Sequence, residues 1–179
     1  MGPFRLLDLV GIDVNFLVSK SIYEQFFGEP RFRPVILQQK MVESGLLGRK
    51  SGSGFYNYDE QSPRASLRIE RRDSFVSESI REMASKISSR MEIKNHLNDS
   101  QRLILARTVS MIVNEAFFMT EEGVSTEEDI DLAMKLGTNY PHGPIEFGSI
   151  IGKYLIAEFL ETLRRAYGDA YRPSSLLSY

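Results

Sequence analysis

One stretch of this chain occurs twice, and the repetition constrains the fold more than any other feature. Residues 2–15 read GPFRLLDLVGIDVN, and residues 143–156 return as GPIEFGSIIGKYLI with no gap between the copies. Both glycines and the proline coincide, as do several apolar positions. With a small gap, residues 28–37 also echo residues 168–177. An internal repeat of this kind predicts two structural units built alike.

Each copy predicts a long helix. Gly-Pro before a run of helical period is typical of a helix start, because proline at the first position loses no needed donor. In the second copy one helical face carries apolar residues as far as Gly168, at Ile145, Ile151, Leu155, Phe159 and Leu163. We therefore expect one helix of roughly 24 residues, ~36 Å long, and the same design from Pro3 to Phe27. Gly11 and Gly152 lie inside these helices, where we expect close helix packing.

Further helices are expected between and beside the copies. Residues 101–122 carry a broad apolar face that Gly123 ends, and Pro34 should begin a short helix that stops at Gly45. Ser125 and Glu128 have capping-box spacing, which predicts a helix from Ser125 to Gly137. The acidic residues 127–129 would lie in its first turn, where the helix dipole accounts for them without catalysis or a metal.

The middle of the chain differs in composition. Residues 59–66 are typical of a linker. Val76, Ile80, Met83 and Ile87 then form one narrow apolar stripe on a polar helix. We interpret this as a connector helix lying across the body, and a partner-binding helix is the alternative.

Composition excludes several functional classes. The net charge of −2 gives no support to a nucleic-acid or anionic-membrane partner. No uninterrupted apolar run approaches the ~18 residues of a membrane span. The chain has no cysteine, which excludes disulfides and thiolate metal sites and agrees with a cytoplasmic location. No cluster of residues suggests a metal site.

The glycine-rich stretch at residues 47–58, LGRKSGSGFYNY, invites a phosphate-binding interpretation. Neither a P-loop nor a GxGxxG dinucleotide turn occurs in the chain. We therefore favour a turn that seats Phe55 and Tyr56 against the helices. The alternative is contact of Arg49 or Lys50 with an anion or a CoA phosphate.

The two histidines, His96 and His142, are candidates for a general base by residue type. His142 aligns with Met1 of the first copy, which has no acid–base chemistry, so we interpret it as a turn residue. His96 has no evident triad partner, and a hydrolase that uses either histidine is the weakest of the functional hypotheses.

The same residues carry a family resemblance. The pattern GPFxLLDxxGxD, followed by FFGxPRFRP and then LGRKxGxGFYxY, resembles the C-terminal domain of the 3-hydroxyacyl-CoA dehydrogenases across residues 2–58. The second copy resembles the same domain from Asp99 onward, through NEA, EEDIDLAMKLG and YPHGP. The resemblance implies an all-α fold with two copies of that domain packed with approximate twofold symmetry. Residues 1–58 would be a truncated first copy, 59–98 a linker and connector helix, and 99–179 a second copy truncated at its C-terminus.

The resemblance also implies where the chemistry lies. In this family an N-terminal domain binds NAD and supplies a catalytic histidine and glutamate, so no catalytic, cofactor-binding or metal residue is expected here. The family's catalytic asparagine, in an Asn-Arg pair, corresponds to Ala106 before Arg107, a lost catalytic position. The GPF turn lies near the acyl-chain pocket, which makes Pro3, Phe4 and Leu6 candidate substrate contacts, although core packing is the blander role for Phe4 and Leu6.

We therefore expect a fragment of a longer NAD-dependent 3-hydroxyacyl-CoA dehydrogenase of fatty-acid β-oxidation or related acyl-CoA metabolism, inactive alone. Its partners would be the parent's NAD-binding domain and an acyl-CoA substrate. A homodimer and a fused enoyl-CoA hydratase domain fit the same family. The alternative is a non-catalytic helical scaffold or dimerisation module.

Overall fold

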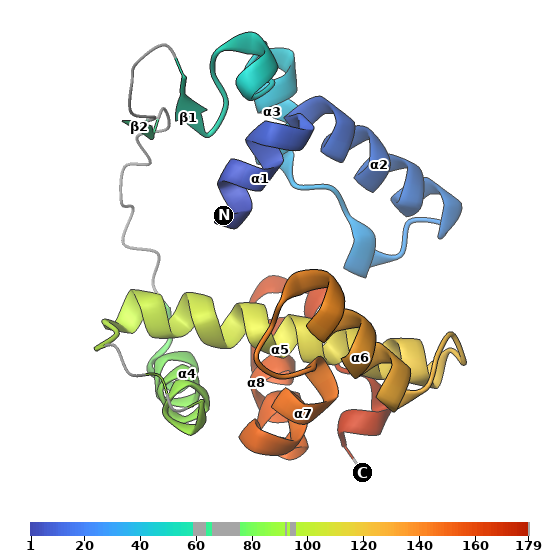
Figure 1. The fold of residues 1–179 in the computed structure, drawn as a ribbon. Coiled ribbons are helices and arrows are strands. Elements are labelled where there is room, and N and C mark those ends of the chain that lie inside the picture. Colours follow the sequence, from blue (N-terminus) through green and yellow to red (C-terminus); the bar gives the residue numbers. More distant parts are fainter. Residues whose placement is uncertain (59–63, 66–75, 92, 94–95, 179) are drawn as a thin grey trace. The chain divides into compact units, whose positions relative to one another are not determined.

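The chain forms two compact units, residues Met1–Ser74 (unit 1) and Phe75–Tyr179 (unit 2). A computed structural model describes residues 1–58, 64–65, 76–91, 93 and 96–178. Figure 1 shows the course of the chain through both units.

Unit 1 is built from short helices and one small ribbon. Its elements are α1 (Pro3–Val10), α2 (Ile12–Gln25), the 3₁₀ turn Pro30–Phe32, α3 (Ile36–Glu43), the 3₁₀ turn Arg49–Ser51, β1 (Tyr56–Asn57) and β2 (Arg64–Ala65). The two strands pair antiparallel, with Tyr56 opposite Ala65. Apart from this two-residue ribbon, the described part of unit 1 contains no strand, so the expected helical class is confirmed. The predicted linker at residues 59–66 falls outside the described residues except for β2.

Unit 2 is helical throughout its described part. Its elements are α4 (Glu78–Arg90), α5 (Asp99–Glu121), α6 (Glu127–Thr138), α7 (Pro144–Ile151), α8 (Lys153–Tyr167) and the 3₁₀ turns Asp169–Tyr171 and Ser175–Leu177. Helix α5 is the long central element, and α4, α6, α7 and α8 all pack against it (Figure 1).

The prediction of one continuous helix in each copy is wrong, and it is wrong in the same way twice. The chain breaks at Gly11 between α1 and α2, where φ is +104°, and at Gly152 between α7 and α8, where φ is +98°. Such φ values are open to glycine and strained for other residues. Gly11 and Gly152 are therefore turn residues between two short helices, and both Gly-Pro helix starts are confirmed.

The core of unit 2 gathers apolar side chains from α4, α6, α7, α8 and both 3₁₀ turns around α5. Gly148 of α7 allows a close approach, since a Cβ there would lie 3.1 Å from the ring of Phe117 and 3.2 Å from Val113. The stripe predicted for the connector helix faces this core, because Ile80 and Ile87 are fully buried. Helix α4 therefore packs as part of unit 2.

Several helix ends differ from expectation by one or two residues, and α5 begins at Asp99 rather than residue 101. The cap of α6 is Thr126, not Ser125, because the Thr126 hydroxyl accepts the Asp129 N–H at 3.2 Å. Helix α6 runs on to Thr138 and ends at Asn139 in the left-handed region. Helix α3 begins at Ile36 rather than Pro34, since Val35 keeps extended geometry. These shifts of one to two residues are usual at helix ends.

By length and composition alone, α5 could cross a membrane, with a mean hydropathy of 1.4 over its most apolar window. The expectation from sequence considered only uninterrupted apolar runs and missed this averaged signal. Nearly half of that window, 44%, is buried inside the structure. A core helix passes the same test, so the observation is weak evidence for a membrane role.

Candidate functional site

The best-defined polar feature of unit 1 is the carboxylate of Asp8 on α1. Asp8 is 1% exposed. Its Oδ1 accepts the Phe55 N–H at 2.8 Å, and its Oδ2 accepts the Tyr56 N–H at 3.0 Å and the Tyr58 hydroxyl at 2.9 Å. Hydrogen bonds to an ionised acceptor are stronger than neutral ones. Asp8 therefore fastens the glycine-rich segment to α1.

Two glycines make room for this carboxylate. A side chain at Gly48 would overlap the Asp8 backbone, and one at Gly54 would overlap its carboxylate. The segment forms a turn that brings the Phe55 ring to 4.6 Å from that of Phe4. The glycines thus have a packing role that needs no bound phosphate.

The candidate anion contacts, Arg49 and Lys50, are both exposed and both engaged. Lys50 Nζ lies 2.5 Å from Oδ1 of Asp13 and 2.6 Å from its Oδ2, and this hydrogen bond lowers the pKa of the Asp13 carboxyl. The Arg49 guanidinium lies 5.5 Å from the centre of the Tyr58 ring. Burial, and then the bond to Asp8, raise the pKa of Tyr58.

The candidate substrate contacts lie on α1, where Phe4 and Leu6 do not share a helix face. Pro3 occupies the first helical position and is exposed. Phe4 leans on Phe55, whereas Leu6 is two residues further and points elsewhere, because only residues three or four apart share a helix face. Both remain half exposed. Their role in substrate contact stays a prediction.

In unit 2 a different aspartate performs a related task. Asp131 on α6 accepts the Ile145 N–H at 2.7 Å and the Glu146 N–H at 3.0 Å, so it caps the start of α7. Glu146 also bonds Lys135 at 2.7 Å, and this contact, followed by the Gly143 N–H, lowers the Glu146 pKa. His142 lies 3.5 Å from Glu146, in the turn before α7.

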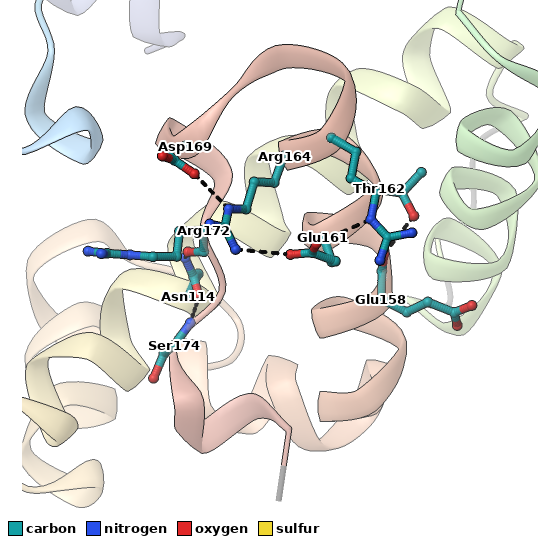
Figure 2. A network of polar contacts seen from close by, with 9 residues as sticks. Asn114, Glu158, Glu161, Thr162, Arg164, Asp169, Arg172 and Ser174 are labelled. Atoms are coloured by element: carbon teal, nitrogen blue, oxygen red, sulfur yellow. Dashed lines mark hydrogen bonds and ion pairs between the residues drawn. The ribbon is translucent and has the colours of Figure 1, made fainter.

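The C-terminal tail is held to α5 by a buried amide. Asn114 is fully buried, donates to the Arg172 carbonyl at 2.9 Å and accepts the Ser174 N–H at 2.8 Å (Figure 2). Further along α5, Glu121 accepts the hydroxyls of Ser174 at 2.6 Å and Ser175 at 2.7 Å. These two bonds lower the Glu121 pKa. Figure 2 also shows Arg164 bonded to Asp169 at 2.7 Å, which ties α8 to the start of the tail.

Ala106, the position predicted to have lost a catalytic asparagine, lies in the core. Ala106 is fully buried among apolar side chains. Arg107 is exposed, and its guanidinium lies 4.9 Å from the centre of the Tyr171 ring in the tail. Since an alanine has no side-chain donor or acceptor, this position offers a substrate nothing to bond.

The described part of the chain gives no evidence for a metal site or for catalysis by a histidine. No group of three or more His, Asp or Glu side chains there could hold a metal ion. His96 is exposed ahead of α5, and His142 belongs to the turn network of Glu146.

The described residues of each unit line an open hollow. A hollow of about 230 Å³ in unit 1 lies between α2, α3 and the segment that joins the 3₁₀ turn to α3. A hollow of about 500 Å³ in unit 2 lies beside Glu121, Arg164 and Arg172. Neither contains a candidate site residue from the sequence.

Three organising residues were not given roles from the sequence: Asp8, Asn114 and Asp131. Each is a polar residue within an otherwise apolar or helical run. Asp8 and Asn114 are buried, and a buried polar group needs partners. The place of these residues in such runs was the sequence signal that could have pointed to their roles. The partners are 14 to 60 residues away, so the contacts themselves could not be found from local pattern.

Comparison with known proteins adds the family context. The model of the "3-hydroxyacyl-CoA dehydrogenase, C-terminal domain" family matches residues 1–58 and 103–179. A 3-hydroxyadipyl-CoA dehydrogenase of Escherichia coli is 33% identical over an alignment that covers 99% of this chain and 50% of the relative. A peroxisomal fatty acid beta-oxidation multifunctional protein of Arabidopsis thaliana, MFP2, is 32% identical, with 99% of this chain and 24% of the relative covered.

A solved structure is similar to this chain in fold and sequence. The 3-hydroxybutyryl-CoA dehydrogenase of Escherichia coli matches with a TM-score of 0.71 and 31% identity, over 99% of this chain and 50% of that one. The chain thus spans about half the length, or less, of these relatives.

Proposed function

Since this chain belongs to the 3-hydroxyacyl-CoA dehydrogenase C-terminal domain family, we propose that it serves as the helical, substrate-side and dimerisation portion of an NAD-dependent 3-hydroxyacyl-CoA dehydrogenase. The whole enzyme would oxidise a 3-hydroxyacyl-CoA to a 3-ketoacyl-CoA in fatty-acid β-oxidation or related acyl-CoA metabolism. The observation that carries the proposal is the family match in both units, together with the helix–glycine–helix element that recurs in each.

The repetition suggests how the portion works. Two copies of one domain on one chain replace the association of two separate chains, because tethering raises the effective concentration to about the millimolar range. We infer that the copies pack with approximate twofold symmetry and so form a dimer in cis. Further association into a homodimer belongs to the same proposal.

The residues that the structure describes do not fit NAD. The chain has no GxGxxG turn, and its one described strand pair is a two-residue antiparallel ribbon rather than the parallel sheet that such a turn requires. NAD would bind to the parent's own N-terminal domain. Within this portion, Pro3, Phe4 and Leu6 would line the acyl side, and Arg49 or Lys50 would meet the CoA phosphates.

A non-catalytic helical scaffold or dimerisation module remains the second candidate. It is favoured by Ala106, which is buried and apolar where the resembled family has its asparagine. In either case the chain alone would be inactive, and a cytoplasmic location is proposed for it.

A reconstitution assay tests the proposal. The half of the Escherichia coli 3-hydroxybutyryl-CoA dehydrogenase that this chain does not match is expressed separately. It is mixed with this chain, 3-hydroxybutyryl-CoA and NAD. We expect NADH to form in the mixture and not with either part alone. The relative's own C-terminal half is the positive control. NADH formation by this chain alone would contradict the proposal, as would an inactive mixture beside an active control.

A further inference from the structure

Two arginines of unit 1 stack on the two tyrosines at strand β1. The Arg5 guanidinium lies 5.4 Å from the centre of the Tyr56 ring. The Arg49 guanidinium lies 5.5 Å from the centre of the Tyr58 ring. Cations within about 6 Å of a ring centre are attracted to the face of the ring. Since both arginines are exposed and both tyrosines are partly buried, the rings hold two positive charges at the surface of unit 1.

One carboxylate holds both tyrosines. Asp8 of α1 accepts the Tyr56 N–H at 3.0 Å and the Tyr58 hydroxyl at 2.9 Å. Arg5 stands three residues before Asp8, so these two side chains share one face of α1. Tyr58 follows Tyr56 by two residues, and alternate residues along a strand point to the same side. The two arginine–tyrosine pairs are therefore neighbours around one buried anchor.

Neither arginine forms an ion pair within the described part of unit 1. The ion pairs there join Lys20 to Glu24, Arg31 to Glu29 and Lys50 to Asp13. The buried carboxylate of Asp8 receives its hydrogen bonds from neutral donors, which are two N–H groups and one hydroxyl. The charge of both arginines is therefore available to an anionic ligand.

Lys50, the other basic residue of the glycine-rich segment, has a different task. Its Nζ lies 2.5 Å from Oδ1 of Asp13 and 3.2 Å from the place that a Cβ would take at Gly11. In unit 2 a guanidinium nitrogen of Arg90 lies 2.8 Å from the corresponding place at Gly152. A cation thus lies against the glycine break in both units, which assigns Lys50 to the break between α1 and α2 rather than to a ligand.

The chemistry of stacked arginines suits phosphate. A guanidinium presents its N–H groups in a planar fork that matches the oxygens of a phosphate, and it can donate two of them while its face rests on a ring. Stacking also limits the freedom of the side chain before the ligand arrives, so less entropy is lost on binding. Two such side chains next to one another therefore favour a ligand that carries more than one phosphate group.

We propose that Arg5 and Arg49 together bind the phosphate groups of an acyl-CoA, with Tyr56 and Tyr58 as positioning residues beneath them. The inference rests on the proposed function, which supplies CoA as the ligand. It adds Arg5 as a ligand contact and selects Arg49 over Lys50. Asp8 acts through the two tyrosines, because it fixes the segment on which the arginines stack.

Calorimetric titration of the full chain with CoA tests the proposal. Arg5→Gln and Arg49→Gln should each weaken CoA binding by about tenfold or more, because each removes hydrogen bonds between charged groups. Lys50→Gln is the matched control, since it removes an equal charge from the neighbouring residue. It should weaken CoA binding by about threefold or less, as expected for an exposed charge that does not touch the ligand.

Two further measurements separate ligand contact from a structural role. Added salt should weaken CoA binding by the unaltered chain, and less so for Arg49→Gln, because fewer charges are then screened. Tyr58→Phe keeps a ring beneath Arg49 and should keep CoA affinity, although it loses the bond to Asp8 and with it some thermal stability. Tyr58→Leu removes the ring and should weaken CoA binding by about two- to fivefold.

The inference has clear contradicting results. It is overturned if the full chain binds no CoA, if Lys50→Gln weakens binding as much as Arg49→Gln does, or if Arg5→Gln leaves binding unchanged. Inorganic phosphate is the comparison ligand, and an affinity for it equal to that for CoA would show a general anion site and overturn the assignment to acyl-CoA.

The reconstitution assay distinguishes this inference from the proposed function. In an active mixture, Arg5→Gln and Arg49→Gln should raise the KM for 3-hydroxybutyryl-CoA more than they change kcat, because they remove binding that ground state and transition state share. An active mixture with an unchanged KM would refute the arginine pair and leave the proposed function standing. An inactive mixture beside CoA binding that depends on Arg49 would do the reverse.

Discussion

The hydroxyl of Tyr58 donates a hydrogen bond of 2.9 Å to the carboxylate of Asp8, fifty residues earlier in the chain. This bond and the two backbone N–H bonds to the same carboxylate hold the end of the glycine-rich segment against α1. The carboxylate lies on α1, and its donors come from the end of the glycine-rich segment. Unit 1 therefore depends on one buried charge for the position of its only candidate anion-binding segment.

Asp8→Ala should destabilise unit 1 by about 2–4 kcal/mol, because it leaves two partly buried N–H groups and one hydroxyl without an acceptor. Urea unfolding followed by tyrosine fluorescence measures the change. Tyr58→Phe removes one donor and keeps the ring, so a loss of only about 1–2 kcal/mol is expected. Equal urea midpoints for Asp8→Ala and the unaltered chain would contradict this role of Asp8.

Gly11→Ala and Gly152→Ala should each cost about 1–3 kcal/mol, because both residues have φ near +100°. The matched control is Gly2→Ala, where φ is −76° and nothing lies within 4 Å of the new methyl. Thermal unfolding of the three variants compares them. If the glycines lay within continuous helices, alanine would instead stabilise the protein by about 1 kcal/mol.

Asn114→Ala should loosen the C-terminal tail on α5, since it removes the two bonds that the Asn114 amide makes to the Arg172–Ser174 segment and leaves the Ser174 N–H buried without an acceptor. The expected loss is about 2–3 kcal/mol, with faster hydrogen exchange over residues 168–178. Ser175→Ala is the control, because it removes one exposed hydrogen bond of the tail to Glu121 and should cost under about 1 kcal/mol. Unchanged exchange in the tail of Asn114→Ala would refute the clamp.

Glu121 should make tail docking dependent on pH. Its pKa is lowered from 4.5 by the Ser174 and Ser175 hydroxyls, so its folded value lies below its unfolded one. Such a group contributes stability that is fully present above pH 4.5 and is lost as the pH falls through the folded pKa. Carbon-13 NMR of the Glu121 carboxyl measures the pKa directly, and Ser174→Ala should raise it. A value of 4.5 or higher in the unaltered chain would contradict the hydrogen bonds that are described.

Local pattern in the sequence was enough to predict where α1 and α7 begin, because Pro3 and Pro144 each occupy the first helical position. Ser125 and Thr126 are neighbours, and both are residue types that cap helices. Sequence pattern alone could not decide between them, and the structure shows that Thr126 caps α6.

The breaks at Gly11 and Gly152 were missed for a physical reason. A glycine inside a helical period costs only about 1 kcal/mol, so periodicity alone does not distinguish a tolerated glycine from one with positive φ. The recurrence of glycine at the same position in both copies was the stronger signal, because it indicates a backbone requirement rather than chance.

The candidate anion contacts show more clearly what local sequence pattern cannot predict. Arg49 and Lys50 were chosen from composition, but their partners Tyr58 and Asp13 depend on how the glycine-rich turn folds back on α1 and α2. Long-range contacts of this kind set what a side chain can do, and short motifs do not contain them.

We propose that the two copies of one helical domain pack as a dimer within a single chain. A crystal structure of the whole chain measures this arrangement through the rotation that superposes α1 and α2 of unit 1 on α7 and α8 of unit 2. We expect an approximate twofold rotation between the two elements. A rotation far from twofold would overturn the proposal.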